Sequence, residues 1–216
     1  MDNLIFLKLG GSLITDKTRP FTPRLDKLED LAAQLATFRR ADPGLLIVLG
    51  HGSGSFGHIP AKKYGTRAGI SPPLTPPLGG RTGCTPEDRK NSPFPLRGKA
   101  RMGAEQYWRG FAEVWYQAST LTRFVVSALH AAKIPAMALP PSASVTTKDG
   151  KVAAWDLSPL RRALEAGIMP VVHGDVIFDE ARGGTILSTE DLFAHLAREM
   201  RPQRSPAGWN PKPARC

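Results

Sequence analysis

The sequence predicts an α/β fold built around a parallel sheet. Two short apolar runs, residues 4–7 and 45–49, are rich in branched side chains, as buried strands are, and each leads directly into a glycine-rich loop. Between them, residues 23–40 repeat leucine, alanine and phenylalanine at spacings of three and four, the pattern of an amphipathic helix. Strand, loop, helix, strand and loop in this order are typical of a βαβ unit, whose strands lie parallel.

The loop at residues 50–58 has the composition of a phosphate-binding site. It reads GHGSGSFGH, with four glycines and two serines. Glycine lets backbone N–H groups approach a ligand closely, and a helix that begins in the loop would add the free N–H groups of its first turn. The last residue, His58, can donate a hydrogen bond to an oxyanion near neutral pH.

This loop has two other interpretations. Residues 52–57 also match G-x-G-x-x-G, the dinucleotide fingerprint, which would indicate a nicotinamide-dependent oxidoreductase. That fingerprint needs an acidic residue about 20 positions later, and residues 71–80 contain none. A plain structural turn is the other alternative, although a turn needs fewer glycines.

The first glycine loop lies between two cations. Lys8 belongs to an apolar strand, where a free ammonium group is costly unless it finds an anion, and Lys17 follows the turn Gly10-Gly11-Ser12. In the alternative interpretation, Lys8 lies on an edge strand with its amine in water. Neither loop is a Walker A motif. Two glycine loops, each after a strand, favour a phosphate held between them.

The second half of the chain continues the alternation of helices and strands. The sequence predicts a helix at 105–133, a strand at 134–139, a tight turn at 148–150, a helix at 157–166 and a buried strand at 169–172. This last strand leads to His173, interpreted as structural, and to Gly174, at the end of a strand where such folds place ligands. A further helix begins near Ser188, with Asp191 in its first turn.

Two segments depart from this pattern. Residues 71–102 are proline-rich and without periodicity, which predicts a disordered insertion, and residues 201–216 read as a basic, proline-rich tail. Each carries a net charge of +4, so only +2 of the total +10 belongs to the rest of the chain. The basic composition therefore gives no support to a nucleic-acid-binding face. We expect one domain over residues 1–200, followed by the tail.

Composition excludes several classes of protein. Hydrophobic residues make up 41% of the 216, enough for a core, and no apolar run is long enough to span a membrane. The first strand begins near the N-terminus without a signal peptide. Cys84 and Cys216 form no metal-ligand spacing, and we expect no metal site built by the protein itself. These features predict a cytoplasmic protein without disulfides that binds neither membrane nor nucleic acid.

Five stretches of the sequence carry a resemblance to a known family. They are LKLGGSLITDK at 7–17, HGSGSFGH at 51–58, PPSASV at 140–145, PVVHGDVIFD at 170–179 and ILSTEDLFAHLA at 186–197. In this order they resemble the isopentenyl phosphate kinases of the amino acid kinase superfamily. The Ser-Phe-Gly-His ending separates these kinases from relatives that phosphorylate carboxylates. Ser53 stands where a third consecutive glycine is usual.

The resemblance implies a three-layer α/β/α sandwich with a mainly parallel sheet. It also implies transfer of the γ-phosphoryl group of ATP, accompanied by Mg²⁺, to isopentenyl phosphate, by a chain that can form a homodimer. In that scheme His58 contacts the acceptor phosphate, Lys8 and Lys17 offset the developing charge, and Asp191 organises the two lysines. The phosphate contacts fall to Gly10, Gly11, Ser12, Gly52, Ser53, Gly54, Gly57 and Gly174.

The resemblance ends after residue 201. Relatives continue there with a strand and a nucleotide-binding half, whereas residues 202–216 are rich in proline and poor in apolar residues. We therefore expect the chain to retain the acceptor side and to lack most of the ATP side. Two functions follow: an ATP-dependent isopentenyl phosphate kinase, active or impaired, or a catalytically inactive protein that binds phosphates or a partner.

Overall fold

The computed structural model describes residues 3–16, 18–70 and 99–200, with the backbone alone at residues 99–102. Lys17, residues 71–98 and residues 201–216 lie outside this description. The predicted tail and most of the predicted insertion therefore fall outside it as well.

The main sheet consists of four parallel strands, as the sequence predicted. Their order is β1 (Leu4–Leu9), β2 (Leu46–His51), β6 (Met169–His173) and β3 (Ala136–Ala138). The helix α2 (Leu25–Ala41) connects β1 to β2, which completes the predicted βαβ unit. The carboxyl ends of β1, β2 and β6 therefore meet at one edge of the sheet, and both glycine loops start there.

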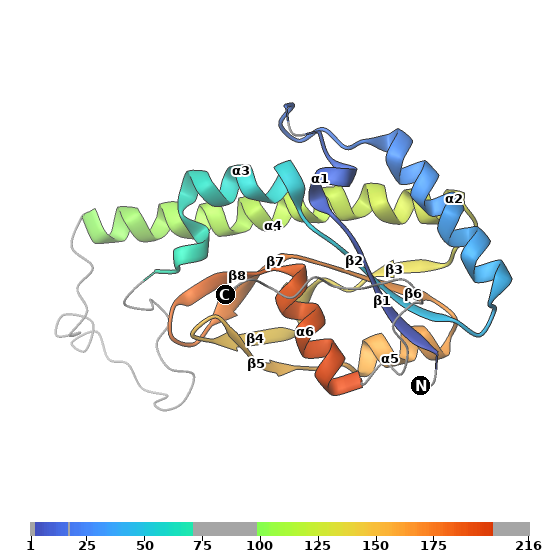
Figure 1. Ribbon diagram of the computed structural model, residues 1–216. Helices are drawn as coiled ribbons and strands as arrows, with labels where there is room; N and C mark the ends of the chain where they lie inside the picture. The colour runs from blue at the N-terminus through green and yellow to red at the C-terminus, as the bar shows by residue number, and fades with distance from the viewer. Residues whose placement is uncertain (1–2, 17, 71–98, 201–216) are drawn as a thin grey trace, which may run out of the picture.

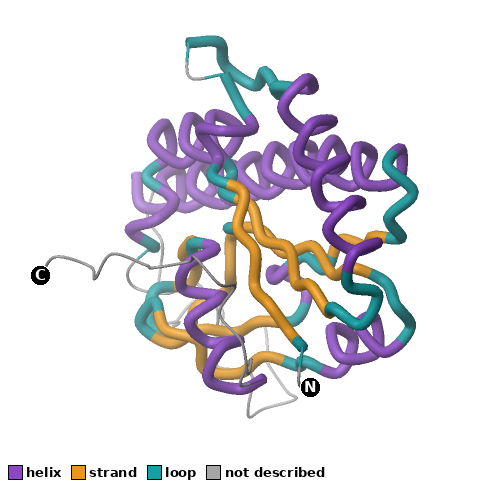
Figure 2. The backbone as a smooth tube through the Cα atoms, turned by 45° about the vertical axis from the view of Figure 1, so that its right-hand side comes forward, coloured by secondary structure: helices purple, strands orange, loops and turns teal. Residues whose placement is uncertain are grey.

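Helices cover both faces of this sheet (Figure 1). One layer contains α2, α3 (Gly54–Tyr64) and α4 (Lys99–Ala131), and the other contains α5 (Ser158–Glu165) and α6 (Thr189–Met200). Figure 2 shows the strands between the two helical layers. The three-layer α/β/α sandwich is thus confirmed.

Side chains of β1 alternate between the two layers, because successive residues of a strand point to opposite faces. Ile5 and Leu9 pack in the cluster formed with α2 and α4, whereas Leu4 packs with residues of α5 and α6. In β2, Ile47 packs in the cluster with α2 and α4, and Val48 packs with residues of α5 and α6. Burial on both faces is the reason that these strands are apolar throughout rather than alternating with polar residues.

A second sheet of four strands lies beyond the carboxyl end of the main sheet. Its order is β5 (Lys151–Trp155), β4 (Val145–Lys148), β7 (Asp175–Asp179) and β8 (Gly183–Leu187). The antiparallel pair β4–β5 confirms the predicted turn at 148–150, but the hairpin β7–β8 was not predicted. The Asp179 carboxylate joins the two hairpins, because it accepts N–H groups from Gly150 at 2.7 Å and from Arg182 at 2.8 Å.

The remaining elements are short: α1 (Gly11–Ile14), η1 (Thr66–Ala68) and η2 (Pro141–Ala143). The prediction of a disordered insertion was wrong for its last residues, because α4 already begins at Lys99. Residues 99–102 contain no proline and four good helix formers, lysine, alanine, arginine and methionine, so they extend the helix that follows. None of the described helices is both long and apolar enough to cross a membrane.

Candidate phosphate-binding site

The two glycine loops lie directly against each other. The N–H of Gly52 donates to the carbonyl of Leu9 at 3.0 Å, and a Cβ placed on Gly11 would lie 2.5 Å from the nitrogen of Gly54. Gly54 has φ +51°, a conformation that side chains rarely adopt, and it is the first residue of α3. The segment after the second loop is therefore helical, which is the condition that the phosphate-site interpretation set, and its free N–H groups start where the loops meet.

Thr15 forms hydrogen bonds with both glycine loops, although the sequence did not indicate it as a site residue. Its hydroxyl donates to the Gly11 carbonyl at 2.8 Å and accepts the Ser55 N–H at 3.3 Å, with the side chain 2% exposed. No local pattern marks this threonine, because its second bond exists only once α3 lies beside the first loop.

A cavity of about 870 Å³ opens above the loops. Its walls come from β1 and the two loops, from the first turns of α3, and from the end of β8 and the start of α6. The predicted site residues that line it are Lys8, Gly10, Gly11, Ser12, Gly52, Ser53, Gly54, Gly57, His58 and Gly174. Of the remaining two predicted residues, Lys17 lies outside the described residues and Asp191 is not among the lining residues.

Lys8 pairs with Glu190 rather than with Asp191. Its ammonium group makes an ion-paired hydrogen bond with the Glu190 carboxylate at the wall of the cavity. Partial burial alone would raise the pKa of Glu190, but the hydrogen bond from Lys8 holds the pKa below its usual value. The alternative interpretation placed Lys8 on an edge strand with its amine in water. Among the described strands β1 is indeed an edge strand, but the Lys8 side chain is only 29% exposed.

The structure gives Asp191 the contacts of a helix cap. Its carboxylate accepts the N–H of Ser188 at 3.0 Å and the Ser188 hydroxyl at 2.7 Å, and the Ser188 oxygen accepts the Asp191 N–H at 3.2 Å. This reciprocal arrangement is a capping box at the start of α6. Glu190 faces β1 and Asp191 does not, because successive helical residues point about 100° apart; that Asp191 organises Lys8 and Lys17 stays a prediction, since Lys17 lies outside the described residues.

Replacing the capping residue is expected to affect stability more than replacing the partner of Lys8. Asp191→Ala removes both carboxylate bonds of the cap and should lower the free energy of unfolding by about 1 kcal/mol. Glu190→Gln removes one solvent-screened ion pair and should change it by less than about 0.5 kcal/mol. Urea denaturation of both variants measures this difference, and equal losses would contradict the assignment of the cap.

Further polar groups line the same cavity. The Ser55 hydroxyl is buried and finds no hydrogen-bond partner among the described residues. Thr189 donates its hydroxyl to the carbonyl of His51 at 2.7 Å, which ties the start of α6 to the end of β2. Arg67 of η1 adds an exposed cation that the sequence analysis did not select. Within the described ranges, no cluster of three or more histidine, cysteine, aspartate or glutamate side chains could hold a metal ion.

A parallel α/β/α sandwich with paired glycine loops at the carboxyl edge of its sheet is the architecture of a phosphate-binding α/β protein. The chain belongs to the amino acid kinase family, whose sequence profile matches residues 3–205. Within that family it is similar to isopentenyl phosphate kinases. It is 28% identical over 202 residues to the isopentenyl phosphate kinase of Methanocaldococcus jannaschii, and 32% identical over 205 residues to that of Methanothermobacter thermautotrophicus.

These alignments cover 92% and 93% of this chain, and 65% of each relative. The chain therefore spans just under two thirds of the length of these curated relatives. A solved structure described as "X-ray structures of isopentenyl phosphate kinase" has a TM-score of 0.75 and 29% identity, covering 94% of this chain and 70% of the other. The resemblance found in the sequence motifs is thus confirmed.

Proposed function

We propose that the chain acts in the ATP-dependent phosphorylation of isopentenyl phosphate, with the acceptor phosphate in the glycine-loop cavity. One observation supports this most strongly: the cavity gathers both glycine loops, Lys8 and His58 from segments far apart in the sequence. Relatives named isopentenyl phosphate kinase match nearly the whole length of this chain.

The cavity has the chemistry that phosphoryl transfer needs. Transfer depends on positioning and on stabilisation of negative charge, and hardly on covalent chemistry by the protein. Backbone N–H groups at the start of α3 face an anion favourably, and Lys8 supplies a positive charge that Glu190 holds in place. No general base is required, because the attacking oxygen belongs to an ionised phosphate. We assign Lys17 as the second cation, and Mg²⁺ as an ion that arrives with ATP.

His58 is proposed as the hydrogen-bond donor to the acceptor phosphate. It lies in the second turn of α3, exposed at the cavity wall, one turn beyond the N–H groups that start the helix. The apolar residues Ile59, Ala61, Val114 and Ile186 line the same cavity. A hydrogen-bond donor for phosphate together with apolar lining residues suits a ligand that is a short hydrocarbon phosphate better than one that is a polar amino acid.

The test is ATP consumption by the purified chain with isopentenyl phosphate. We expect turnover, and we expect His58→Ala to reduce it about 100-fold, the usual loss when one donor to a charged transition state is removed. Lys62→Ala is the matched control, because Lys62 is exposed on the same helix and does not line the cavity. It should keep the activity of the unmodified chain.

Two other results would contradict catalysis in different ways. No turnover, with isopentenyl phosphate still raising the melting temperature, would indicate the catalytically inactive phosphate-binding protein instead. Neither turnover nor stabilisation would overturn the placement of the acceptor phosphate as well.

A further inference from the structure

The glycine-loop cavity extends along the whole of α3. The lining residues Gly54, Gly57, His58 and Ala61 recur at spacings of three and four, so they share one face of this helix. Arg67, in η1 just beyond the last residue of α3, lines the cavity as well. A helix of 11 residues is about 16 Å long. The cavity therefore has two ends, one at the glycine loops and one at η1.

The strand β8 connects the same two ends. At one end of this strand, the Thr185 hydroxyl donates to the Arg67 carbonyl at 3.3 Å. At the other, the Leu187 carbonyl oxygen lies 3.3 Å from the position that a Cβ on Gly174 would take. Ile186 and Leu187 line the cavity between these two contacts. A second element thus places Arg67 at the end of the cavity away from the phosphate loops.

The wall between the two ends is apolar. Ala61 of α3, Val114 of α4 and Ile186 of β8 all line the cavity and belong to one hydrophobic cluster. A ligand that reached from the glycine loops to η1 would therefore lie against hydrocarbon over the middle of its length.

The positive charge at the η1 end has no partner in the described part of the chain. The Arg67 side chain is exposed and makes no hydrogen bond or ion pair with any described residue. Its backbone is held in place, because the neighbouring Thr66 is buried and accepts the Tyr107 hydroxyl at its carbonyl at 3.1 Å. Among the described lining residues the one carboxylate is that of Glu190, which pairs with Lys8 at the opposite end.

We propose that this cavity also accepts phosphate esters longer than isopentenyl phosphate, with an apolar chain and a carboxylate at the far end that Arg67 binds. The inference rests on the proposed function for the position of the phosphate. Cavities for drug-sized ligands span roughly 300–1,000 Å³, so isopentenyl phosphate leaves part of this cavity of about 870 Å³ unfilled. One planar guanidinium matches a carboxylate with two parallel hydrogen bonds, whereas a second phosphate would need further cations.

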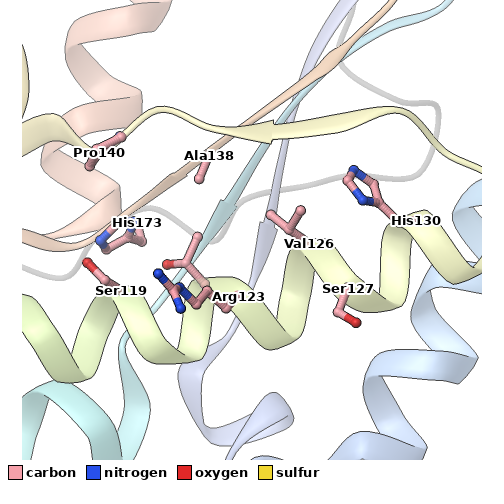
Figure 3. Close-up of a pocket in the computed structure, with 9 residues that line it drawn as sticks. Ser119, Arg123, Val126, Ser127, His130, Ala138, Pro140 and His173 are labelled. Atoms are coloured by element: carbon pink, nitrogen blue, oxygen red, sulfur yellow. The ribbon is translucent and has the colours of Figure 1, made fainter.

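A separate cavity of the described residues also contains an arginine. It has a volume of about 490 Å³ and lies between α4 and the end of β3, where Figure 3 shows Arg123 on α4. It shares no lining residue with the glycine-loop cavity. Its His173 is 1% exposed, and neither ring nitrogen, both buried, has a hydrogen-bond partner among the described residues. Arg123 therefore serves as a control for the charge of Arg67.

The test is a calorimetric titration of the full chain with 6-(phosphonooxy)hexanoate and with hexyl phosphate, two probes that differ in the carboxylate. We expect the carboxylate probe to bind at least about tenfold more tightly, because it adds a charge-assisted hydrogen bond. Arg67→Gln should abolish this preference and leave the affinity for hexyl phosphate unchanged. Arg109→Gln and Arg123→Gln remove the same charge from exposed positions outside the cavity, so both variants should keep the preference.

Three results would overturn the inference while the proposed function stands. Equal binding of both probes to the unmodified chain would show that the carboxylate finds no partner. A preference that survives Arg67→Gln would place the carboxylate elsewhere. A preference that Arg109→Gln reduces as much as Arg67→Gln would indicate a general effect of net charge. Failure of hexyl phosphate to bind at millimolar concentration is a different outcome, because it would also contradict the placement of the acceptor phosphate at the glycine loops.

Discussion

Gly54→Ala is expected to abolish phosphate binding at the glycine loops and to destabilise the chain by about 2–4 kcal/mol. The reason is a combination of two effects at one residue. Gly54 has φ +51°, so any side chain there is strained. The new Cβ would also lie 2.8 Å from the Gly11 carbonyl oxygen and would collide with the Thr15 side chain. The loops can accommodate it only by separating.

Gly65→Ala separates the strain from the collision. Gly65 ends α3 with φ +62°, nearly the same conformation, but a Cβ there would meet no atom within 4 Å. This control should lose only about 1 kcal/mol and should bind pyrophosphate as the unmodified chain does. Urea denaturation and calorimetric titration with pyrophosphate measure both quantities. If the two variants behaved alike, contact between the loops would not be what shapes the site.

Acid is expected to destabilise the chain well before its surface carboxylates are protonated. Burial, aided by the neighbouring His173, lowers the pKa of His51 to about 3, and burial lowers that of His173 to about 4. Below pH 6.5 the two histidines bind protons in the unfolded chain but stay neutral in the folded chain. The free energy of unfolding that is present above pH 6.5 is therefore lost as the pH falls. Asp175 acts in the opposite direction, because burial raises its pKa to about 6 and the folded state then takes up a proton first.

The stability lost through the two histidines as the pH falls is larger than the stability gained through the aspartate. Between pH 7 and pH 4.5 the balance of the three groups amounts to roughly 3 kcal/mol of lost stability. Urea denaturation at pH 7, 5.5 and 4.5 measures this slope directly. His173→Phe should flatten it, because it removes one of the two rings whose pKa burial lowers. A chain equally stable at pH 4.5 and pH 7 would show that the histidine pair accepts protons in the folded state.

The parts of the fold that the sequence predicted are those with strong local patterns. The apolar runs of β1 and β2, the spacing within α2 and the glycines after both strands each act over a few residues. The hairpin β7–β8 was not predicted, because its two strands are short, β8 begins with two glycines, and neither strand has a clear periodicity. Its register is fixed by neighbours distant in sequence, among them the turn that Asp179 ties to Gly150.

The same distinction applies to the site. Lys8, His58 and the loop glycines were selectable, because residue type and spacing alone suggest phosphate chemistry. The choice between Glu190 and Asp191 was not, because it depends on where α6 begins relative to β1. The unpaired ring of His173 was equally hidden, since a buried histidine in a sequence looks the same whether or not a partner reaches it.

The glycine-loop cavity has walls from four distant stretches of chain, near residues 8–15, 52–67, 114 and 174–190. An unfolded chain brings none of these walls together, and a chain in which α6 has not yet docked lacks the wall that the start of α6 supplies. Phosphate ligands can therefore bind only the completed native state. By mass action such a ligand withdraws molecules from the unfolded population, so the concentration of the ligand would itself influence how long the chain survives proteolysis.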